Sequence, residues 1–453
     1  MEPKIPKIVA STGHTYCCSI AESRIRQESL CTPALPTPAS SQLELAVGGR
    51  EEDAEQNYFK SAQWTPDGTS ILTSSADNSI RTFVVPSDLL SSTSPKTLTP
   101  YTTHLHPTSI NCVTPYPHFT LTDPSTTLYL STPNSLPTRL LNALYPTATP
   151  TATYPLVSPT TEAYYTPASL LWSSPSTFLA GTDCLIALFD VERNGQGPVT
   201  RLPTIPSKRH KMKGGGVGMR GIVSALGMQS EEAGMLAAGT WTRWVGLYDA
   251  NGMGGTVAQW SVAEAADQHA ELGGGGVTQT VWSGCGRYLC VVERKSGGVL
   301  VYDVRVTGKV VAWLEGREAW TNQRLGVDVF EGEGGMEVWA GGVDGIVRVW
   351  NGVGRSEGAM ERAWEWKAHD DPVTSTIVHS SGMVVATCSG QRSTPMTDDS
   401  ESSSEDSDSD EDSNEDSDES CSDEESENQS ATSNQAPLLN SRAPDNSIKV
   451  WSL

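Results

Sequence analysis

Several features that mark common classes of protein are missing from this sequence. No run of 18 apolar residues occurs, so we expect no membrane-spanning helix. Residues 1–6 lack the apolar segment of a secretory signal peptide, and we expect none. The nine cysteines include no Cys-x-x-Cys pair, and the neighbours Cys17 and Cys18 cannot form an ordinary structural bridge. Reduced, buried cysteines without a zinc ribbon are therefore expected.

Signatures of enzymes and of cofactor sites are missing as well. The eight histidines show no metal-ligand spacing, and we find no pairing of a nucleophile with a base. Residues 216–221 match Gly-x-Gly-x-x-Gly, but a basic run precedes them and a strand-like segment follows. A dinucleotide site needs a strand before the glycines and a helix after them. We expect a protein that is not an enzyme and that uses no cofactor or metal.

Basic residues are in the minority, but the imbalance is local. The chain has 31 Lys and Arg against 54 Asp and Glu, a net charge of −23. Residues 398–427 hold 17 of the acidic residues and no Lys or Arg; without them 37 acidic residues face 31 basic ones, a net charge of −6. The rest of the chain is only mildly acidic and can carry basic patches.

A short phrase that recurs along the chain is the most informative feature present. Clear copies lie at 77–83, 344–350 and 445–451, and each is a polar turn followed by an alternating strand that ends in an aromatic residue. Weaker copies lie at 185–190, 244–249 and 299–303, and the poorest at 137–142. A repeat of about 40 to 60 residues indicates stacked units. Seven such copies predict an all-β fold, a seven-bladed WD40 β-propeller with disordered insertions.

Polar residues at fixed places in the repeat are interpreted as structural. Aspartates occupy the turns before the third strands; they are Asp77, Asp183, Asp344 and Asp445. A carboxylate in such a turn can accept backbone N–H bonds and hold the hairpin. His369 lies where blades often place a histidine that bonds within the blade, so we expect a packing role for it and no ligand.

Composition divides the rest of the chain. Residues 1–42 are expected to be mostly disordered, and 43–393 to form the propeller, with an irregular Pro/Thr-rich excursion at about 131–168. The chain ends after a third strand, so the fourth strand of the last blade must come from elsewhere. Residues 7–11 and 43–47 are candidates for this closing strand, and we favour 43–47 because it lies next to blade one.

The last blade is predicted to carry a long insertion. Residues 394–439 are Ser, Asp and Glu with almost no apolar content, so we expect disorder there and the final strand within 440–453. Four serines with an acidic residue three positions on are expected phosphorylation sites: Ser407, Ser409, Ser413 and Ser422. The insertion could mimic nucleic acid, contact basic proteins or mask a basic face; the alternative is a solvated loop without a partner.

Two patterns point to nucleic acid. A basic run ahead of the glycines suits phosphate binding and consists of Lys208, Arg209, Lys211, Lys213 and the later Arg220. Aromatic residues stand among basic and amide residues at Trp241, Arg243, Trp320, Asn322, Gln323, Arg324, Gln391 and Arg392. Single-stranded RNA is recognised by stacking on such planes and by amide bonds to base edges. A solvated loop and core tryptophans are the alternative interpretations.

Several of these motifs resemble the telomerase Cajal body protein 1 family: residues 57–68, 72–78, 221–224, 321–324 and 386–392. Thr-Asn-Gln-Arg and Ser-Gly-Gln-Arg, within the last two segments, are more specific than general WD40 features. The resemblance implies an RNA-binding, seven-bladed nuclear propeller. Members of that family recognise a short box in small Cajal-body RNAs and in vertebrate telomerase RNA, and fungal relatives are linked to pre-mRNA splicing.

Two functions remain open at this stage. The first is a non-enzymatic propeller that binds small nuclear RNA and helps to assemble or localise its ribonucleoprotein. The second is a protein–protein scaffold in a nuclear complex, such as one for pre-mRNA splicing or ubiquitin ligation, without RNA contact. Both predict a monomeric propeller with other proteins on its faces and no membrane, located in the nucleus, with a cytoplasmic pool as the alternative.

Overall fold

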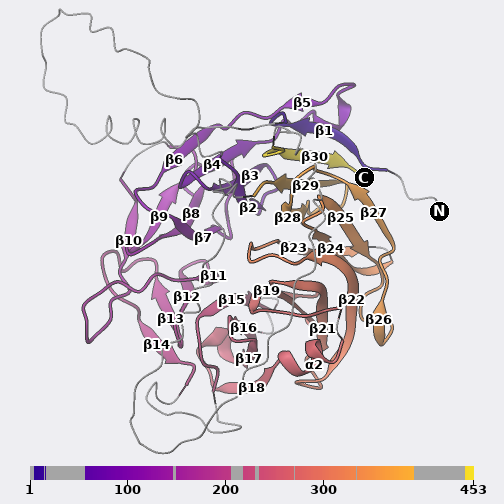
Figure 1. Cartoon of the computed structure of the whole chain (residues 1–453). Helices are drawn as coiled ribbons and strands as arrows, with labels where there is room; N and C mark the ends of the chain where they lie inside the picture. The colour runs from indigo at the N-terminus through magenta and orange to yellow at the C-terminus, as the bar shows by residue number, and fades with distance from the viewer. Residues whose placement is uncertain are drawn as a thin grey trace, which may run out of the picture. The chain divides into compact units, whose positions relative to one another are not determined.

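The computed structural model describes residues 5–14, 16, 57–145, 149–205, 218–229, 234–269, 271–332, 334–391 and 444–453. All of them belong to one unit of the chain. Their strands form seven separate sheets arranged as the blades of a β-propeller (Figure 1). The prediction of an all-β, seven-bladed propeller is therefore confirmed. One short helix, α2 (Ala263–Asp267), and two 3-10 turns, η2 (Leu89–Ser91) and η3 (Ala250–Gly252), accompany the sheets.

The first four blades each contain four antiparallel strands in chain order. Blade one consists of β2 (Phe59–Trp64), β3 (Ser70–Ser75), β4 (Ser79–Val84) and β6 (Thr102–Leu105). Blade two consists of β7 (Ile110–Pro115), β8 (Leu128–Pro133), β9 (Thr138–Asn142) and β10 (Ala152–Tyr154). Blade three consists of β11 (Ser169–Ser174), β12 (Thr177–Thr182), β13 (Leu185–Asp190) and β14 (Thr200–Pro203). Blade four consists of β15 (Val223–Met228), β16 (Leu236–Thr240), β17 (Trp244–Tyr248) and β18 (Thr256–Ser261).

The last three blades follow the same plan with small additions. Blade five consists of β19 (Val277–Trp282), β20 (Tyr288–Glu293), β21 (Ser296–Asp303) and β22 (Val310–Ala319), with β26 (Gly358–Met360) added in parallel. Blade six consists of β23 (Val327–Gly332), β24 (Gly335–Gly341), β25 (Ile346–Trp350) and β27 (Trp364–Lys367). Blade seven consists of β28 (Val373–Val378), β29 (Val384–Ser389), β30 (Ile448–Ser452) and β1 (Lys7–Ser11), with β5 (Lys96–Thr97) added in parallel.

The third strand of every blade coincides with a copy of the recurring phrase. This includes the weakest copy, which becomes β9. The Pro/Thr-rich region at 131–168 departs from expectation, because residues 138–142 and 152–154 form β9 and β10 of blade two. Only its later part is an irregular connection, held by an isolated bridge between Val157 and Tyr164. Threonine suits strands, and the prolines lie at strand ends, since Pro133 is the last residue of β8 and Pro137 directly precedes β9.

The two ends of the described chain close the ring. β1 pairs antiparallel with β30, with Lys7 opposite Ser452 and Ser11 opposite Lys449 (Figure 1). The expectation that residues 43–47 supply this strand is wrong; that segment lies outside the described residues. β1 suits the position because a bulge gives it apolar residues on both faces. Val9 and Ala10 join the core next to blade one, while Ile8 packs with Trp451 on the other face.

A buried hydrogen-bond network fixes blade seven. Trp451 Nε1 donates to Thr387 Oγ1 at 2.9 Å, and that oxygen lies 2.7 Å from His369 Nε2. Burial lowers the pKa of His369, so its neutral form is favoured. Burial also opposes the charge of Asp445, but hydrogen bonds from His369, Lys449 and Ser447 outweigh it and lower the pKa of that carboxyl. The histidine thus has the packing role expected of it.

Candidate functional site

The first strands of the seven blades surround a central cavity of about 840 Å³. Each blade is antiparallel, so the start of its first strand, the end of its second and the start of its third lie at one end of the sheet. We call this end the entry face. The connections between blades and the turns between second and third strands lie there. Most of the residues expected to bind RNA belong to these segments.

Three of the four turn aspartates at the entry face pair with a cation four residues on. Asp77 accepts two bonds from Arg81, at 3.1 and 2.5 Å, and one from the backbone N of Ser79 at 3.2 Å. Asp344 repeats the pattern with Arg348, at 3.2 and 2.6 Å. In blade seven the cation is Lys449, which bonds Asp445 at 2.8 Å. In the sequence this ion pair is visible as Asp-x-x-x-Arg or Asp-x-x-x-Lys. From the sequence the aspartates were considered alone, and the cation four residues later was not included.

The fourth turn aspartate is different. Asp183 lines the central cavity and forms an isolated backbone bridge with Ile222 of the next blade. Its carboxylate lies 3.3 Å from the thiol of Cys184. No cation follows it four residues on. This aspartate therefore places a negative charge at the cavity wall of blade three.

Trp241 and Arg243 lie in the turn between β16 and β17. Trp241 is 38% exposed, and the guanidinium carbon of Arg294 lies 5.1 Å from the centre of its ring. Arg243 instead bonds Glu293 at 2.8 Å and Asp267 at 2.9 Å. Two carboxylates already neutralise its charge. Trp241 offers an accessible aromatic plane, whereas Arg243 mainly ties blade four to blade five.

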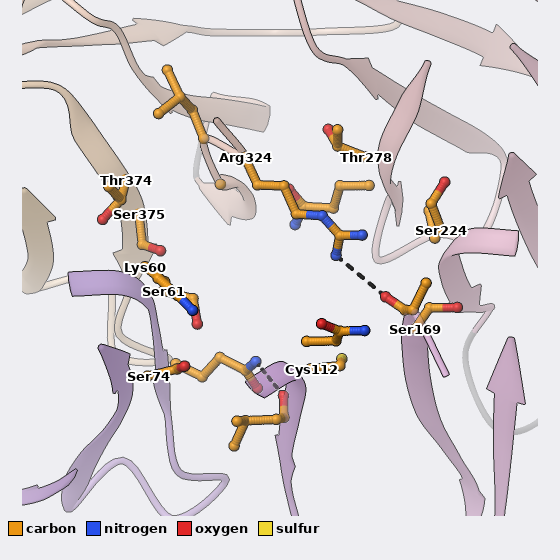
Figure 2. Close-up of a pocket in the computed structure, with 18 of the residues that line it drawn as sticks. Lys60, Ser61, Ser74, Cys112, Ser169, Ser224, Thr278, Arg324, Thr374 and Ser375 are labelled. Carbon is orange, nitrogen blue, oxygen red and sulfur yellow. Dashed lines mark hydrogen bonds between the residues drawn. The ribbon is translucent and has the colours of Figure 1, made fainter. Parts of the chain in front are cut away.

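The segment 320–324 connects blade five to blade six. Trp320 is 51% exposed, and Asn322 is also exposed. Gln323 donates from Nε2 to the carbonyl of Gly390 at 2.8 Å, which joins this connection to blade seven. Arg324 extends across the cavity and donates to the carbonyl of Ala168 at 3.3 Å, next to blade three (Figure 2). Burial lowers the pKa of Arg324, and the nearby Arg294 adds to this effect.

The remaining predicted residues divide into two groups. Arg220 and Gln391 are exposed at the entry face, one in the connection before β15 and one after β29. The others lie outside the described residues; they are Lys208, Arg209, Lys211, Lys213, Arg392 and the four serines Ser407, Ser409, Ser413 and Ser422. The described residues on either side of this run lie together, because Met219 N donates to Thr204 O at 2.8 Å.

Sequence reasoning missed several residues of the cavity. Lys60 of β2 and Asn111 of β7 line it, together with many hydroxyl side chains of the first strands (Figure 2). Lys60 and Asn111 are each the second residue of a first strand. This position is the only feature of the sequence that could have indicated their place at the cavity. Within the described ranges, no group of His, Cys, Asp and Glu side chains is arranged to hold a metal ion. No helix in the same ranges is both long and apolar enough to cross a membrane.

Comparison with known proteins agrees with this architecture. The model of the WD domain, G-beta repeat, matches residues 55–83, which end within β4. Guanine nucleotide-binding protein negative regulator 1 of Schizosaccharomyces pombe is 28% identical over 300 residues, covering 65% of this chain and 70% of that protein. Telomerase Cajal body protein 1 of Rattus norvegicus is 27% identical over 349 residues, and that of Homo sapiens 27% over 353 residues. These two matches cover 75% and 76% of this chain.

Over most of its length the chain is similar to the telomerase Cajal body protein 1 of several mammals. The match spans 60% of the length of the rat protein and 59% of the human one. WD40 propellers are typically scaffolds without enzymatic activity. This likeness supports a scaffolding role or a role related to ribonucleoproteins.

Proposed function

We propose that this protein is a non-enzymatic propeller that binds small nuclear RNA, of the small Cajal-body or telomerase type, and helps to assemble or localise its ribonucleoprotein in the nucleus. The observation that carries the proposal is the gathering of exposed aromatic, amide and cationic side chains at one face. Trp241, Gln323 and Arg324 line the cavity there, and the exposed Trp320 belongs to the same connection as the last two. Thr204 and Met219, the described residues on either side of the basic run, are joined by a hydrogen bond.

The chemistry of these groups suits a single-stranded RNA. The exposed rings of Trp241 and Trp320 can stack on bases, and stacking of this kind contributes about 1–3 kcal/mol per base. The side chain of Arg324 has no carboxylate partner among the described residues, and Asn322 and Gln391 can bond base edges. Lys208, Arg209, Lys211 and Lys213 would contact phosphates, as would Arg220. Arg392 would lie near bases, whereas Arg243 would position its neighbours.

The relatives support the cellular setting. Their printed name places the telomerase Cajal body proteins in a nuclear body and with telomerase. By this likeness we propose small nuclear RNA and its bound proteins as partners, a nuclear location, and a monomeric propeller that contacts other proteins through its faces.

The first experiment is crosslinking and immunoprecipitation of the protein from its own cells, followed by sequencing of the attached RNA. Recovery of a discrete set of small nuclear RNAs supports the proposal. Background RNA together with strong protein partners contradicts it. In that case the function is a protein–protein scaffold or adaptor, for example in pre-mRNA splicing or ubiquitin ligation. Two contacts favour this alternative, because Gln323 and Arg324 already bond backbone carbonyls of other blades.

The basic run gives a sharper test in purified protein. Changing Lys208, Arg209, Lys211 and Lys213 to Glu should weaken binding of the recovered RNA about a hundredfold at 0.15 M salt, because phosphate contacts are lost. The dependence of log affinity on log salt should become shallower by about 0.7 for each lost contact. Lys309→Glu, on the opposite face, is the matched control. Unchanged affinity in the fourfold variant would show that the run is a solvated loop.

A further inference from the structure

The first strands share an irregularity at the entry face. Five of the seven carry an irregularity next to their first residue, where one residue, or two in β7, is left out of the pairing with the second strand. Bulges turn side chains away from the regular pleat and often lie beside binding sites. The bulged residues are all polar, apart from Cys112 beside Asn111, and all line the central cavity: Lys60, Asn111, Ser224, Thr278 and Thr374. A ring of redirected polar side chains therefore surrounds the cavity near this face.

The hydroxyl groups in this ring already have hydrogen-bond acceptors. Ser224 donates to the carbonyl of Val277 at 2.5 Å, and Thr278 to that of Val292 at 3.2 Å. Thr374 has an acceptor in its own blade as well, 3.2 Å away. Their protons are used within the fold, so they present mainly lone pairs to the cavity. The donors left for a ligand in the ring are therefore Lys60 and the exposed Asn111.

Lys60 is a cation that the other described residues leave unpaired. Among the described residues, its ammonium has no hydrogen bond and no ion pair within 4 Å. Burial lowers its pKa, and the negative charge of Asp77 opposes this only in part. Asp77 is itself paired with Arg81 at 2.5 Å. A half-buried ammonium without a counter-ion among the described residues is unfavourable for the fold, and an anion in the cavity would offset that cost.

Arg324 reaches the same cavity from another blade. Figure 2 shows its guanidinium directed toward Ser169, while Lys60 lies beside Ser375. One of its five N–H donors is used on Ala168, at 3.3 Å, and no carboxylate pairs with it in the described part of the chain. The two cations thus enter from different sides. They suit two phosphates in succession better than a single one.

The carboxylates that line the cavity leave room for such a ligand. Asp328 accepts the backbone N–H of Val378, the last residue of β28, so it lies deep in the cavity. Burial raises the pKa of Asp328 to about 6, and the two backbone bonds that it accepts only partly offset this. Asp183 is the other carboxylate on the wall. At the level of the bulges the positive groups prevail, since Arg294 also lies close to Arg324.

We propose that the entry-face end of the cavity binds a chain of two or more phosphates, with Lys60 and Arg324 as its charged contacts and Asn111 as an amide donor. The cavity, about 840 Å³, has the size of typical ligand pockets. Consecutive phosphates of single-stranded RNA and a small free polyphosphate share this chemistry. The site does not depend on the proposed function, because a free polyphosphate would occupy it without any RNA.

The test measures binding of linear tripolyphosphate to the full-length protein by isothermal titration calorimetry. We expect saturable binding that weakens with salt, and a loss of about tenfold or more in Lys60→Gln and in Arg324→Gln. Lys309→Gln, an exposed change outside the cavity, should bind like the parent. Because Arg324 also bonds Ala168, its variant is judged together with Lys60→Gln, which removes no internal contact. Thermal unfolding checks that each variant is folded.

An octauridine competitor distinguishes the two sources of phosphate. If it displaces tripolyphosphate from the parent, RNA can occupy the site; if it does not, a small polyphosphate is the ligand, and either result supports the proposal. Absence of saturable tripolyphosphate binding, or binding that Lys60→Gln leaves unchanged, overturns it. Tripolyphosphate binding through Lys60 without recovery of small nuclear RNA from cells would instead refute the proposed function and leave this site intact.

Discussion

Two lysines of the propeller, Lys449 and Lys60, differ in whether the fold supplies a partner for their charge. Lys449 in β30 bonds the carboxylate of Asp445 at 2.8 Å and the carbonyl of Ala368 at 3.0 Å. Lys60 in β2 lies against the central cavity and, in the described part of the chain, has no such partner. Lys449 is buried and Lys60 is half-buried, but among the described residues only the charge of Lys449 is compensated. Internal compensation marks the groups that hold a blade together, and its lack marks a group available to a ligand.

The same contrast separates whole regions. In blade seven, Asp445, His369, Thr387 and Trp451 satisfy one another inside the sheet. At the cavity, the guanidinium of Arg324 bonds one backbone carbonyl and no carboxylate within the described ranges. A hydrogen-bond network whose charges are all paired within the fold specifies structure. A network with an uncompensated positive charge can bind an anion from outside.

The largest effect should follow from breaking the closed pair. Lys449→Met should lower the free energy of unfolding by about 3–5 kcal/mol, because Asp445 would keep a buried charge without its ammonium partner. Urea denaturation at pH 7 measures the loss. A loss below about 1 kcal/mol would mean that His369 and the backbone N–H of Asp370 suffice for this carboxylate, and the contrast with Lys60 would then disappear.

A buried histidine between blades one and two should make stability depend on pH. Burial lowers the pKa of His106 to about 3, with Arg139 and His104 adding to the effect, and neither ring nitrogen has a partner in the described structure. The unfolded chain binds the proton near its ordinary value of about 6.5, so stability is complete above that pH and declines below it. Between pH 7 and pH 5 the loss should be about 2 kcal/mol.

His106→Leu should remove this part of the pH dependence, because leucine does not titrate. Other buried histidines, such as His369, remain in both proteins, so their contributions cancel in the comparison. Denaturation curves at the two pH values give the result. Equal losses in the parent and in the variant would show that His106 is protonated or hydrated in the folded protein.

Much of the propeller could be predicted because its signal is local. A polar turn followed by an alternating strand is written in consecutive residues, and each copy became a third strand, including β9 in a segment of unpromising composition. The closing strand was assigned wrongly because closeness in sequence does not decide pairing in a ring. The apolar side chains of Ile8 and Val9, on the two faces of β1, do decide it.

The site could be predicted only in part, for a physical reason. Trp320 and Arg324 share a short motif and were recognised together. Lys60 belongs to blade one, far away in the sequence, and joins Arg324 only once the ring is closed. The ion pairs of Arg243 with Asp267 and Glu293 depend in the same way on the packing of blade five against blade four. Ion pairs between residues that are far apart in the sequence cannot be predicted from the spacing of residues along the chain.

A smaller effect, of opposite sign, should follow at the open lysine. Lys60→Met should leave the free energy of unfolding unchanged or raise it by up to about 1 kcal/mol, because it removes a partly desolvated charge that no described residue pairs with. Urea denaturation at pH 7 in a buffer without phosphate is the measurement, with Lys449→Met as the matched variant. A loss of about 2 kcal/mol or more is roughly twice the net contribution of a typical hydrogen bond. Such a loss would show that Lys60 is compensated within the fold.

The smallest effect should come from a paired charge at the surface. Asp267 bonds Arg243 at 2.9 Å, but its side chain is 60% exposed, so water competes for both groups. Asp267→Ala should change the free energy of unfolding by about 0.5 kcal/mol or less, since Arg243 keeps its bonds to the buried Glu293. If Asp267→Ala lowered the free energy of unfolding as much as Lys449→Met does, the presence of an ion pair alone would determine the size of the loss. Burial would then not be what separates the fold-holding charges from the rest.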